Sequence, residues 1–318
     1  RPGFSLRTFE SLKIRNFRFY LFSSIAQMTP MNMQMTASGW FMYKLTGSVA
    51  LLGVAMLVSA VPQLALSFVG GVIADRVSRK VILIAGQLAT MVLMLWVGLF
   101  AHLGIITWYH LLINAFFQGA IMALMMPARQ SIIPSLVGRD NIMNAVGLNM
   151  TGMNLNRLGA PALAGFLIAA FGIHYVYYLM GVLYFVAALL ILPLRLQAPE
   201  VANGGLGRRS VVGDVGKGLA YARDNKDVRA ILVLTLLTIF FSMAYFVVLP
   251  VFTEDILKVG PQGLGLLISG SGVGALIGSL VIASMPSRGR WLLFLHAAAV
   301  TGVGLFFFAW STHYYLSM

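Results

Sequence analysis

The sequence predicts an all-α, polytopic membrane protein whose helices form a bundle of two halves. Three observations predict this fold class. Of the 318 residues, 59% are hydrophobic and only 10% are charged, whereas a soluble domain carries about 25% charged residues. Apolar stretches of about 20 residues, long enough to cross the core of a bilayer, recur along the chain. The basic residues gather in alternate connections between these stretches, which is typical of membrane proteins with a fixed orientation.

Nine stretches have the length and apolarity expected of a transmembrane helix. Six precede a polar stretch at 195–228, and three follow it. We therefore predict an N-terminal six-helix half over 1–194, a cytoplasmic linker over 195–228, and the first three helices of a second half over 229–318. In chain order, the predicted helices cover 17–43, 48–74, 81–101, 105–128, 141–170, 174–194, 229–253, 262–285 and 291–311.

A repeated segment supports the division into two halves. Residues 72–79 read VIADRVSR at the end of the second predicted helix, and residues 281–288 read VIASMPSR at the end of the eighth. Such a recurrence predicts two parallel halves related by an axis normal to the membrane. A complete pair of halves would have twelve helices, so we expect a chain that is truncated after the ninth.

The charges set the orientation and exclude other classes of protein. With the N-terminus in the cytoplasm, all but three of the 22 basic residues lie on the cytoplasmic side, the exceptions being Lys44, Arg157 and Lys258. This asymmetry predicts a multi-pass protein of the cytoplasmic (inner) membrane, with the N-terminus and the central linker inside. It also accounts for the net charge of +13 without a nucleic-acid partner.

The residue types that carry most enzyme chemistry are sparse. The chain has no cysteine, and its five histidines show no metal-ligand spacing. No nucleophile–base pair or carboxylate cluster lies at membrane depth. We therefore expect no enzyme activity, no cofactor and no metal, and we expect a monomer whose partners are the lipid bilayer and a small-molecule substrate.

The segment Gly71–Lys80, GVIADRVSRK, follows the second predicted helix. The negative end of the helix dipole repels the Asp75 carboxylate, which therefore needs a partner such as Arg79 or a helix N-terminus in the other half. The segment resembles the signature between the second and third helices of the major facilitator superfamily, except that Ser78 replaces a glycine. The resemblance implies a gating motif, while the simpler interpretation is a solvated turn that sets topology. The predicted gating residues are Gly71, Asp75, Arg76, Arg79 and Lys80.

A second resemblance extends from Pro127 to Gly165. The segments PARQSIIP at 127–134 and NLNRLGAP at 154–161 are similar to the superfamily branch of the enterobactin exporter and macrolide efflux proteins. The resemblance implies export of a siderophore, macrolide or other drug-like amphiphile by alternating access, with protons as the coupling ion. The arginine that many drug/proton antiporters carry on the fourth helix is absent near Asn114. Alternatives are an importer or lysolipid flippase of the same fold, and a non-transporting sensor or enzyme.

Arg157 is the only Asp, Glu, Lys or Arg deep inside a predicted helix. A charged residue at this depth usually faces a cavity and serves a function. Its predicted partners are Asn149, Asn154, backbone carbonyls, the expected further helices of the second half, or an anionic group of the substrate. The structural alternative is an arginine bonded to helix ends.

Other polar and small residues in the helices suggest a cavity and close packing. Asn114 and Gln118 are four residues apart and share a face of the fourth helix. Pro161 should kink the fifth helix, and glycines at four-residue spacing should permit close helix packing. We expect Glu254 and Asp255 to form a solvated cap. Further predicted cavity residues are Gln27, Asn32, Gln34, Ser242 and Tyr245, and the predicted kink and packing residues are Gly159, Pro161, Gly165, Gly270, Gly274 and Gly278.

Overall fold

The computed structural model describes residues 7–138, 141–194, 221, 223, 225–284, 290–311 and 314. Each of the nine predicted spans is a helix in this structure, with ends within a few residues of those expected. Most of the predicted linker at 195–228 lies outside the described residues. The long helices are α1 (Arg15–Thr46), α2 (Val49–Arg76), α3 (Arg79–His102), α4 (Trp108–Gln130), α6 (Ile142–Phe171), α7 (Ile173–Ile191), α9 (Lys226–Val251), α10 (Gly260–Ser284) and α11 (Arg290–Trp310).

Three short elements flank the long helices. A 3-10 turn, η1 (Arg7–Lys13), precedes α1, and the four-residue helix α5 (Ile133–Leu136) follows α4. A π-helical turn, η3 (Phe252–Ile256), continues α9. The turns between long helices are tight where glycine adopts a positive φ, which is +61° at Gly47 after α1 and +96° at Gly172 between α6 and α7.

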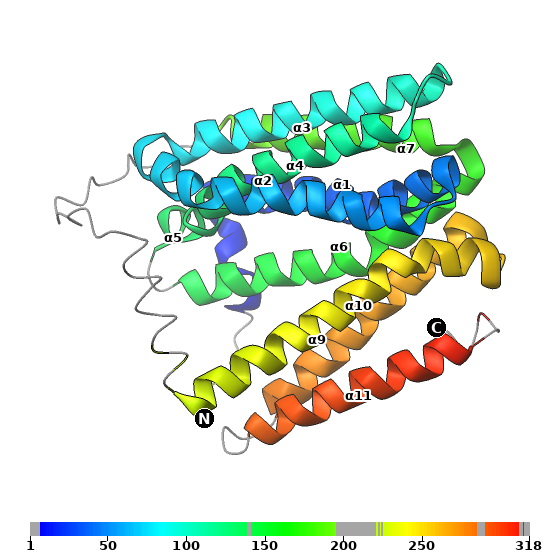
Figure 1. Cartoon of the computed structure of the whole chain (residues 1–318). Helices are drawn as coiled ribbons and strands as arrows, with labels where there is room; N and C mark the ends of the chain where they lie inside the picture. Colours follow the sequence, from blue (N-terminus) through cyan, green and yellow to red (C-terminus); the bar gives the residue numbers. More distant parts are fainter. Residues whose placement is uncertain are drawn as a thin grey trace.

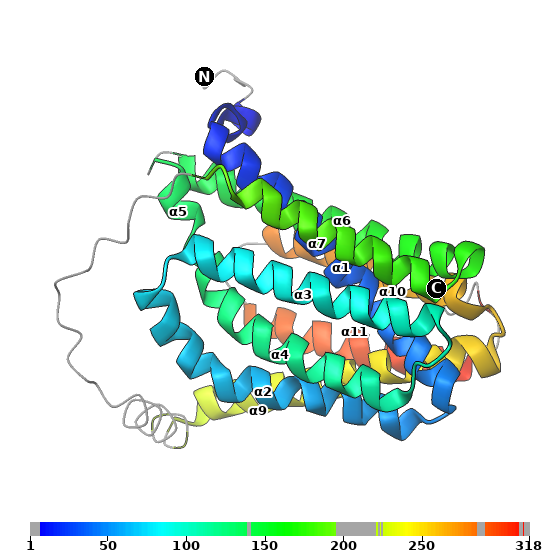
Figure 2. The ribbon, with the colours of Figure 1, turned by 90° about the horizontal axis from the view of Figure 1, so that it is seen from above.

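Helix α1 occupies the centre of the bundle. It packs against α6 and α7 and also contacts α2, α4, α9 and α10. The pairs α2–α4 and α3–α7 form further extensive contacts, and α10 lies along α6 (Figure 1). Helix α11 contacts α9 at the edge of the structure. Seen from above, the helices of the first half run side by side around α1 (Figure 2).

The helices expose apolar surface that suits lipid. Four described helical segments are long and apolar enough, by themselves, to cross a membrane. Large side chains such as Leu64, Phe307 and Trp310 are exposed on the outside of the bundle. Helix α1, which carries Gln27 and Gln34 near its middle, is less apolar than these segments. The four segments are Val49–Ser67, Arg79–His102, Trp108–Gln130 and Ile173–Ile191.

Close packing between α6 and α10 does not follow the predicted glycine stripe. A Cβ atom added to Gly265 would lie 2.4 Å from the Pro161 carbonyl oxygen, and one added to Gly165 would lie 2.2 Å from the carbonyl oxygen of Pro261. At Gly274 and Gly278, no described atom lies within 4 Å of an added Cβ. The predicted packing role of these two glycines is therefore wrong for the described contacts, because they point away from α6.

The two predicted kink residues of α6, Gly159 and Pro161, differ in their burial and contacts. Helix α6 continues through Pro161, which is buried and whose carbonyl oxygen accepts a hydrogen bond of 3.3 Å from the Thr36 hydroxyl on α1. Gly159 is exposed, with open space beside it, so its predicted role in close approach is not seen. The closest backbone approaches of α6 to α10 therefore involve Pro161 and Gly165 on α6 and Pro261 and Gly265 on α10.

Candidate functional site

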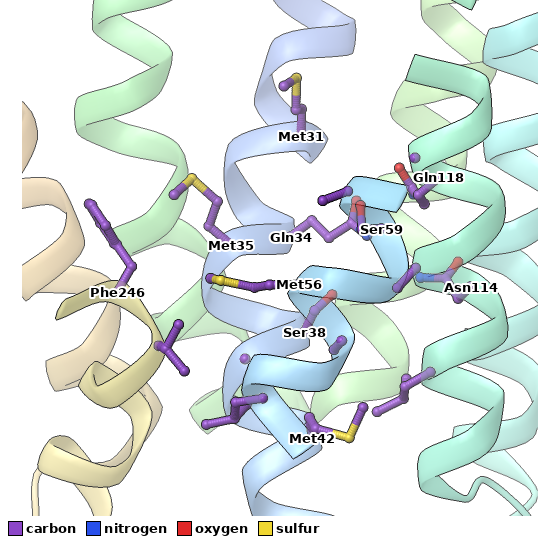
Figure 3. Close-up of a pocket in the computed structure, with 18 of the residues that line it drawn as sticks. Met31, Gln34, Met35, Ser38, Met42, Met56, Ser59, Asn114, Gln118 and Phe246 are labelled. Atoms are coloured by element: carbon purple, nitrogen blue, oxygen red, sulfur yellow. The ribbon is translucent and has the colours of Figure 1, made fainter. Parts of the chain in front are cut away.

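A cavity of about 440 Å³ lies where α1, α2 and α4 meet α9 and α10 (Figure 3). Its volume is in the range of sites that bind small molecules. Three of the five helices belong to the predicted first half and two to the second. A relative movement of these two groups would therefore change the shape of the cavity.

Methionine is the commonest side chain of the cavity wall. Six methionines from three helices line it, and their thioether groups are flexible and polarisable. Such a surface adapts to varied apolar or aromatic groups. The six are Met31, Met35 and Met42 on α1, Met56 on α2, and Met122 and Met126 on α4.

The polar groups in the wall are all uncharged among the described lining residues. Figure 3 shows Gln34 and Ser38 on α1, Ser59 on α2, and Asn114 and Gln118 on α4. The Ser38 hydroxyl lies 3.2 Å from the Tyr177 hydroxyl, which fixes its position. Only 2% of the Asn114 surface is exposed, and its side-chain oxygen has no hydrogen-bond partner among the described residues.

Three of the predicted cavity residues, Gln34, Asn114 and Gln118, lie in this wall. The other amides on α1 do not. Gln27 accepts a hydrogen bond of 3.1 Å from Gln87 inside the bundle, and Asn32 donates to the Met28 carbonyl oxygen of its own helix. These bonds stabilise packing and leave the cavity to residues further along α1.

Of the two predicted cavity residues on α9, Tyr245 lies beside the cavity and Ser242 has a side chain that is not among the described ones. Tyr245 packs edge-on against the rings of Phe246 and Phe308 and is absent from the described lining. Phe246 is the residue of this pair that reaches the wall. The side chain of Ser242 lies outside the described residues.

Arg157 is exposed on α6 and is not among the described residues that line the cavity. Its backbone faces α10, where a Cβ added to Gly272 would lie 3.3 Å from the Arg157 carbonyl oxygen. Asn154 is also exposed. The Asn149 side-chain oxygen accepts a hydrogen bond of 2.9 Å from the Ser24 hydroxyl and the residue is buried, whereas Arg157 is exposed, so the predicted pairing of the two is not seen among the described contacts.

Arg129 is a buried cation, although its position just after the predicted helix 105–128 suggested a loop on the cytoplasmic side. Helix α4 continues through Pro127 to Gln130, so Arg129 lies in its last turn with 9% of its surface exposed. Its guanidinium donates a hydrogen bond of 2.6 Å to the Ser24 hydroxyl. The Tyr20 hydroxyl in turn donates to the Arg129 carbonyl oxygen at 3.4 Å. The predicted helix ended at residue 128 because Arg129 and Gln130 are polar, which concealed the last two residues of α4 and the burial of Arg129.

The segment 71–80, the predicted gating motif, joins α2 to α3. The Arg79 guanidinium donates a hydrogen bond of 2.8 Å to the Ser131 carbonyl oxygen after α4, and the Lys80 ammonium donates to the carbonyl oxygens of Leu192 and Leu194 after α7, at 2.6 and 3.0 Å. Cations at helix C-termini satisfy carbonyls that have no partner within the helix. The side chains of Gly71, Asp75 and Arg76 lie outside the described residues.

The opposite end of α1 contacts the turn after α9. The Trp40 indole N–H donates a hydrogen bond to the Glu254 carboxylate, and the Tyr43 hydroxyl donates to the Asp255 carboxylate. We define these two bonds as the outer contact. Beside it, a Cβ added to Gly39 would lie 3.2 Å from the ring of Pro250. The prediction of a solvated cap is therefore incomplete: Glu254 is half-buried and Asp255 stays exposed, and the π-helical turn directs both carboxylates to donors on α1.

Comparison with known proteins identifies relatives over most of the chain. The family model for the transmembrane secretion effectors of the major facilitator superfamily matches residues 6–317. The staphyloferrin A transporter of Staphylococcus aureus is 25% identical over 250 residues, which cover 76% of this chain and 60% of that protein. The multi-drug resistance efflux pump PmrA of Streptococcus pneumoniae is 32% identical over 140 residues, 43% of this chain and 33% of the pump.

The chain is also similar in sequence to an exporter and in structure to a transporter of known crystal structure. The enterobactin exporter EntS of Salmonella typhi is 30% identical over 193 residues, which cover 54% of this chain and 39% of the exporter. A crystal structure of a bacterial homologue of the human lysosomal transporter Spinster, inward-facing and unoccupied, superposes with a TM-score of 0.65 at 13% identity, covering 89% of this chain and 64% of that one. The chain thus spans at most about 60% of the length of these curated relatives.

Proposed function

The chain belongs to the transmembrane secretion effector family of the major facilitator superfamily, and from this premise we propose that it forms the binding cavity of a secondary transporter that exports a small amphiphilic molecule. The observation that carries the proposal is the cavity of about 440 Å³ between α1, α2 and α4 on one side and α9 and α10 on the other. Apolar walls with a few uncharged polar groups are typical of sites for small amphiphiles.

Transport would follow from rocking the two groups of helices around the cavity. With the N-terminus in the cytoplasm, α1 ends on the outer side of the membrane, so the outer contact lies at the outer end of the bundle. Its two hydrogen bonds close that end in this conformation. The similarity to an inward-facing structure supports the same interpretation. Release to the outside would require the outer contact to break while the gating motif at 71–80 engages the second half.

Direction, energy source and organisation are part of the same proposal. Similarity to a multi-drug efflux pump and to an enterobactin exporter favours export, and we propose a proton gradient across the inner membrane as the driving force. The segments 1–194, 195–228 and 229–318 would be the first half, the cytoplasmic linker and the start of the second half. Transport rather than catalysis is the proposed activity of the assembled protein, which we propose to be a monomer.

Transport by everted membrane vesicles tests the proposal. Vesicles carrying the protein, expressed from its complete reading frame, would receive an inside-acid proton gradient and a labelled panel of siderophores, macrolides and cationic dyes. We expect gradient-dependent uptake of one class that a protonophore abolishes. The double variant Gln34→Leu/Gln118→Leu should lower this uptake about tenfold, because it removes two hydrogen-bonding groups from the wall.

A matched control and a contrary outcome complete the test. Gln130→Leu makes the same change at an exposed position of α4 outside the cavity and should leave uptake unchanged. Absence of uptake of every panel member would contradict export. Uptake by right-side-out vesicles instead would indicate an importer of the same fold.

A further inference from the structure

The outer contact joins α1 to η3 through two carboxylates, that of Glu254, which accepts from Trp40, and that of Asp255, which accepts from Tyr43. A carboxylate that binds a proton loses its charge and becomes a weaker acceptor. We propose that Glu254 and Asp255 form a proton-binding site through which acid on the outer side of the membrane opens the outer end of the bundle. The inference rests on the proposed function and adds a regulation of the same cavity.

Glu254 and Asp255 are the acidic residues that the predicted topology places on the outer side. The other Asp and Glu residues of the 318 lie before α1, in the predicted cytoplasmic connections, or in the linker at 195–228. None of the predicted spans contains a carboxylate. A proton that arrives from the outer compartment therefore meets these two carboxyl groups, and both accept hydrogen bonds from the other group of helices.

Backbone hydrogen bonds hold the turn that carries the two carboxylates. The Leu257 amide donates at 2.8 Å to the Phe252 carbonyl oxygen, and the Val259 amide donates at 2.9 Å to that of Thr253, which is buried. Lys258 then adopts a φ of +53°, which is uncommon for a residue other than glycine. Turns of the π-helical type often occur at functional sites. Because these bonds lie within the turn, its shape does not depend on the bonds to α1.

Proton binding should weaken the outer contact because the strength of its bonds depends on charge. Hydrogen bonds to an ionised group are about twice as strong as those between neutral groups. The closed end therefore favours the ionised carboxylates, and by linkage the uptake of protons favours the open end. Glu254 is half-buried and should contribute most, whereas Asp255 is exposed to water, which weakens its bond from Tyr43.

Other titratable groups around the outer contact do not neutralise the two carboxylates. Lys44 and Lys258 are exposed and form no ion pair with Glu254 or Asp255 in the described contacts. Helix α10 has no titratable side chain. Tyrosine hydroxyls stay protonated in neutral and acid solution, and those near the contact belong to Tyr43, Tyr245 and Tyr314.

Histidines at the same end form a separate cluster within the first group of helices. The ring centroids of His102 on α3 and His174 on α7 lie 4.9 Å apart, and the His110 ring lies 5.6 Å from that of Trp96. None of these three histidines bonds to η3 in the described contacts. Imidazoles titrate at about pH 6.5 and carboxyl groups at about pH 4, so the pH range of a response distinguishes the two.

Distances across the outer end at two values of pH test the proposal. Nitroxide labels would be attached to Leu45→Cys and Ile256→Cys in the protein expressed from its complete reading frame and held in nanodiscs. We expect the ratio of long to short distances to rise about twofold between about pH 7.5 and about pH 4, where carboxyl groups are partly protonated. Little of this rise should occur above about pH 6. Return to neutral pH should restore the first distribution, which excludes unfolding by acid.

Variants without the charge assign the response to the carboxylates. Glu254→Gln keeps the shape and an acceptor oxygen, so it should raise the open ratio about threefold at neutral pH and leave only a small response to acid. The double variant Glu254→Gln/Asp255→Asn should not respond. Glu10→Gln makes the same change at an exposed position of η1, at the opposite end of α1, and should respond as the parent does. Trp40→Phe lacks the donor to Glu254 and should also lose most of the response, which keeps the test if Glu254→Gln does not fold.

Two results would overturn the inference without touching the proposed function. One is an unchanged distance distribution of the parent protein in acid. The other is a response that persists in Glu254→Gln/Asp255→Asn, and its loss in His102→Gln/His174→Gln would then assign it to the imidazoles. Export is measured separately by uptake into vesicles. Absence of uptake together with a pH-dependent distance would contradict export and retain the proton-binding site.

Discussion

The two ends of the bundle use hydrogen bonds in different ways. At the end that we propose to be cytoplasmic, cationic side chains bond to groups of neighbouring helices within the proposed first half. Arg79 and Lys80 reach carbonyl oxygens after α4 and α7, and Arg129 reaches Ser24 on α1. At the end that we propose to face outward, neutral donors of α1 bond to carboxylates that follow α9, in the proposed second half.

This difference separates structural bonds from bonds that must change during transport. Bonds within one half can persist while the halves rock, so they contribute stability to every state. Bonds between the halves stabilise one state only, and their loss shifts the equilibrium between states. Substitutions at the cytoplasmic end should therefore lower stability, and substitutions at the outer end should change conformational populations.

The largest effect is expected at Arg129. The substitution Arg129→Met removes a buried guanidinium and leaves the Ser24 hydroxyl without its described donor. Hydrogen bonds to charged groups contribute about 1.5–3 kcal/mol each, so we expect a loss of about 3 kcal/mol in the free energy of unfolding. Denaturant unfolding in detergent, followed by tryptophan fluorescence, measures it.

Arg157→Met is the matched control, because it makes the same change at an exposed arginine. Its effect should be within about 0.5 kcal/mol. Equal effects of the two substitutions would show that burial of Arg129 does not contribute to stability and would weaken the distinction between the two ends.

A smaller effect is expected where α6 and α10 meet, near the start of α10. In Gly265→Ala, the new methyl group would lie 2.4 Å from the Pro161 carbonyl oxygen and 3.0 Å from the Ala162 Cα. Because both neighbours belong to the backbone, the helices must separate, at a cost of about 1–3 kcal/mol. The unfolding midpoint of the variant measures this cost.

Gly274→Ala provides the comparison on the same helix. No described atom lies within 4 Å of the added methyl group, and alanine favours a helix relative to glycine. Its stability should be unchanged or slightly raised. A loss as large as that of Gly265→Ala would restore the predicted glycine stripe as a packing surface.

The helices could be predicted from the sequence because each depends on local apolarity and length. All nine predicted spans coincide with helices, and the family match confirms the fold. The predicted end of α4 at residue 128 was two residues too early, because the local apolarity stops there, and the last turn of the helix buries Arg129. The error was one of a few residues, but it concealed a buried charge.

The cavity was harder to predict than the helices because side-chain direction depends on packing between distant segments. Gln27 and Gln34 lie on the same helix, yet their side chains have different surroundings. Gln27 accepts a hydrogen bond from Gln87 on α3, whereas Gln34 lines the cavity. Arg157 satisfied a general rule about charges in membranes, but its exposure depends on how α10 packs against α6. The contact of Glu254 with Trp40 joins residues 214 positions apart, which no local pattern indicates.

The smallest effect is expected at the outer contact, where populations rather than stability should change. Trp40→Phe keeps an aromatic ring but removes the donor to Glu254, so we expect the ratio of outward-open to inward-open protein to rise about fivefold. Tyr43→Phe should have a smaller effect, because its bond to Asp255 is exposed to solvent. Spin labels on Leu45→Cys and Ile256→Cys, both exposed positions in a chain without native cysteine, would report the distance across this end.

Tyr175→Phe is the control for the loss of a tyrosine hydroxyl, because Tyr175 is exposed on α7 and its ring contacts His174 and Tyr178 rather than Glu254 or Asp255. Its distance distribution should match that of the parent protein. Trp40→Phe should instead increase the population at long distance without lowering the free energy of unfolding by more than about 1 kcal/mol. An unchanged distribution in Trp40→Phe would mean that the indole bond does not hold the outer end closed. The closure would then depend on apolar packing such as that of Gly39 against Pro250, and the two ends of the bundle would differ less than their hydrogen bonds indicate.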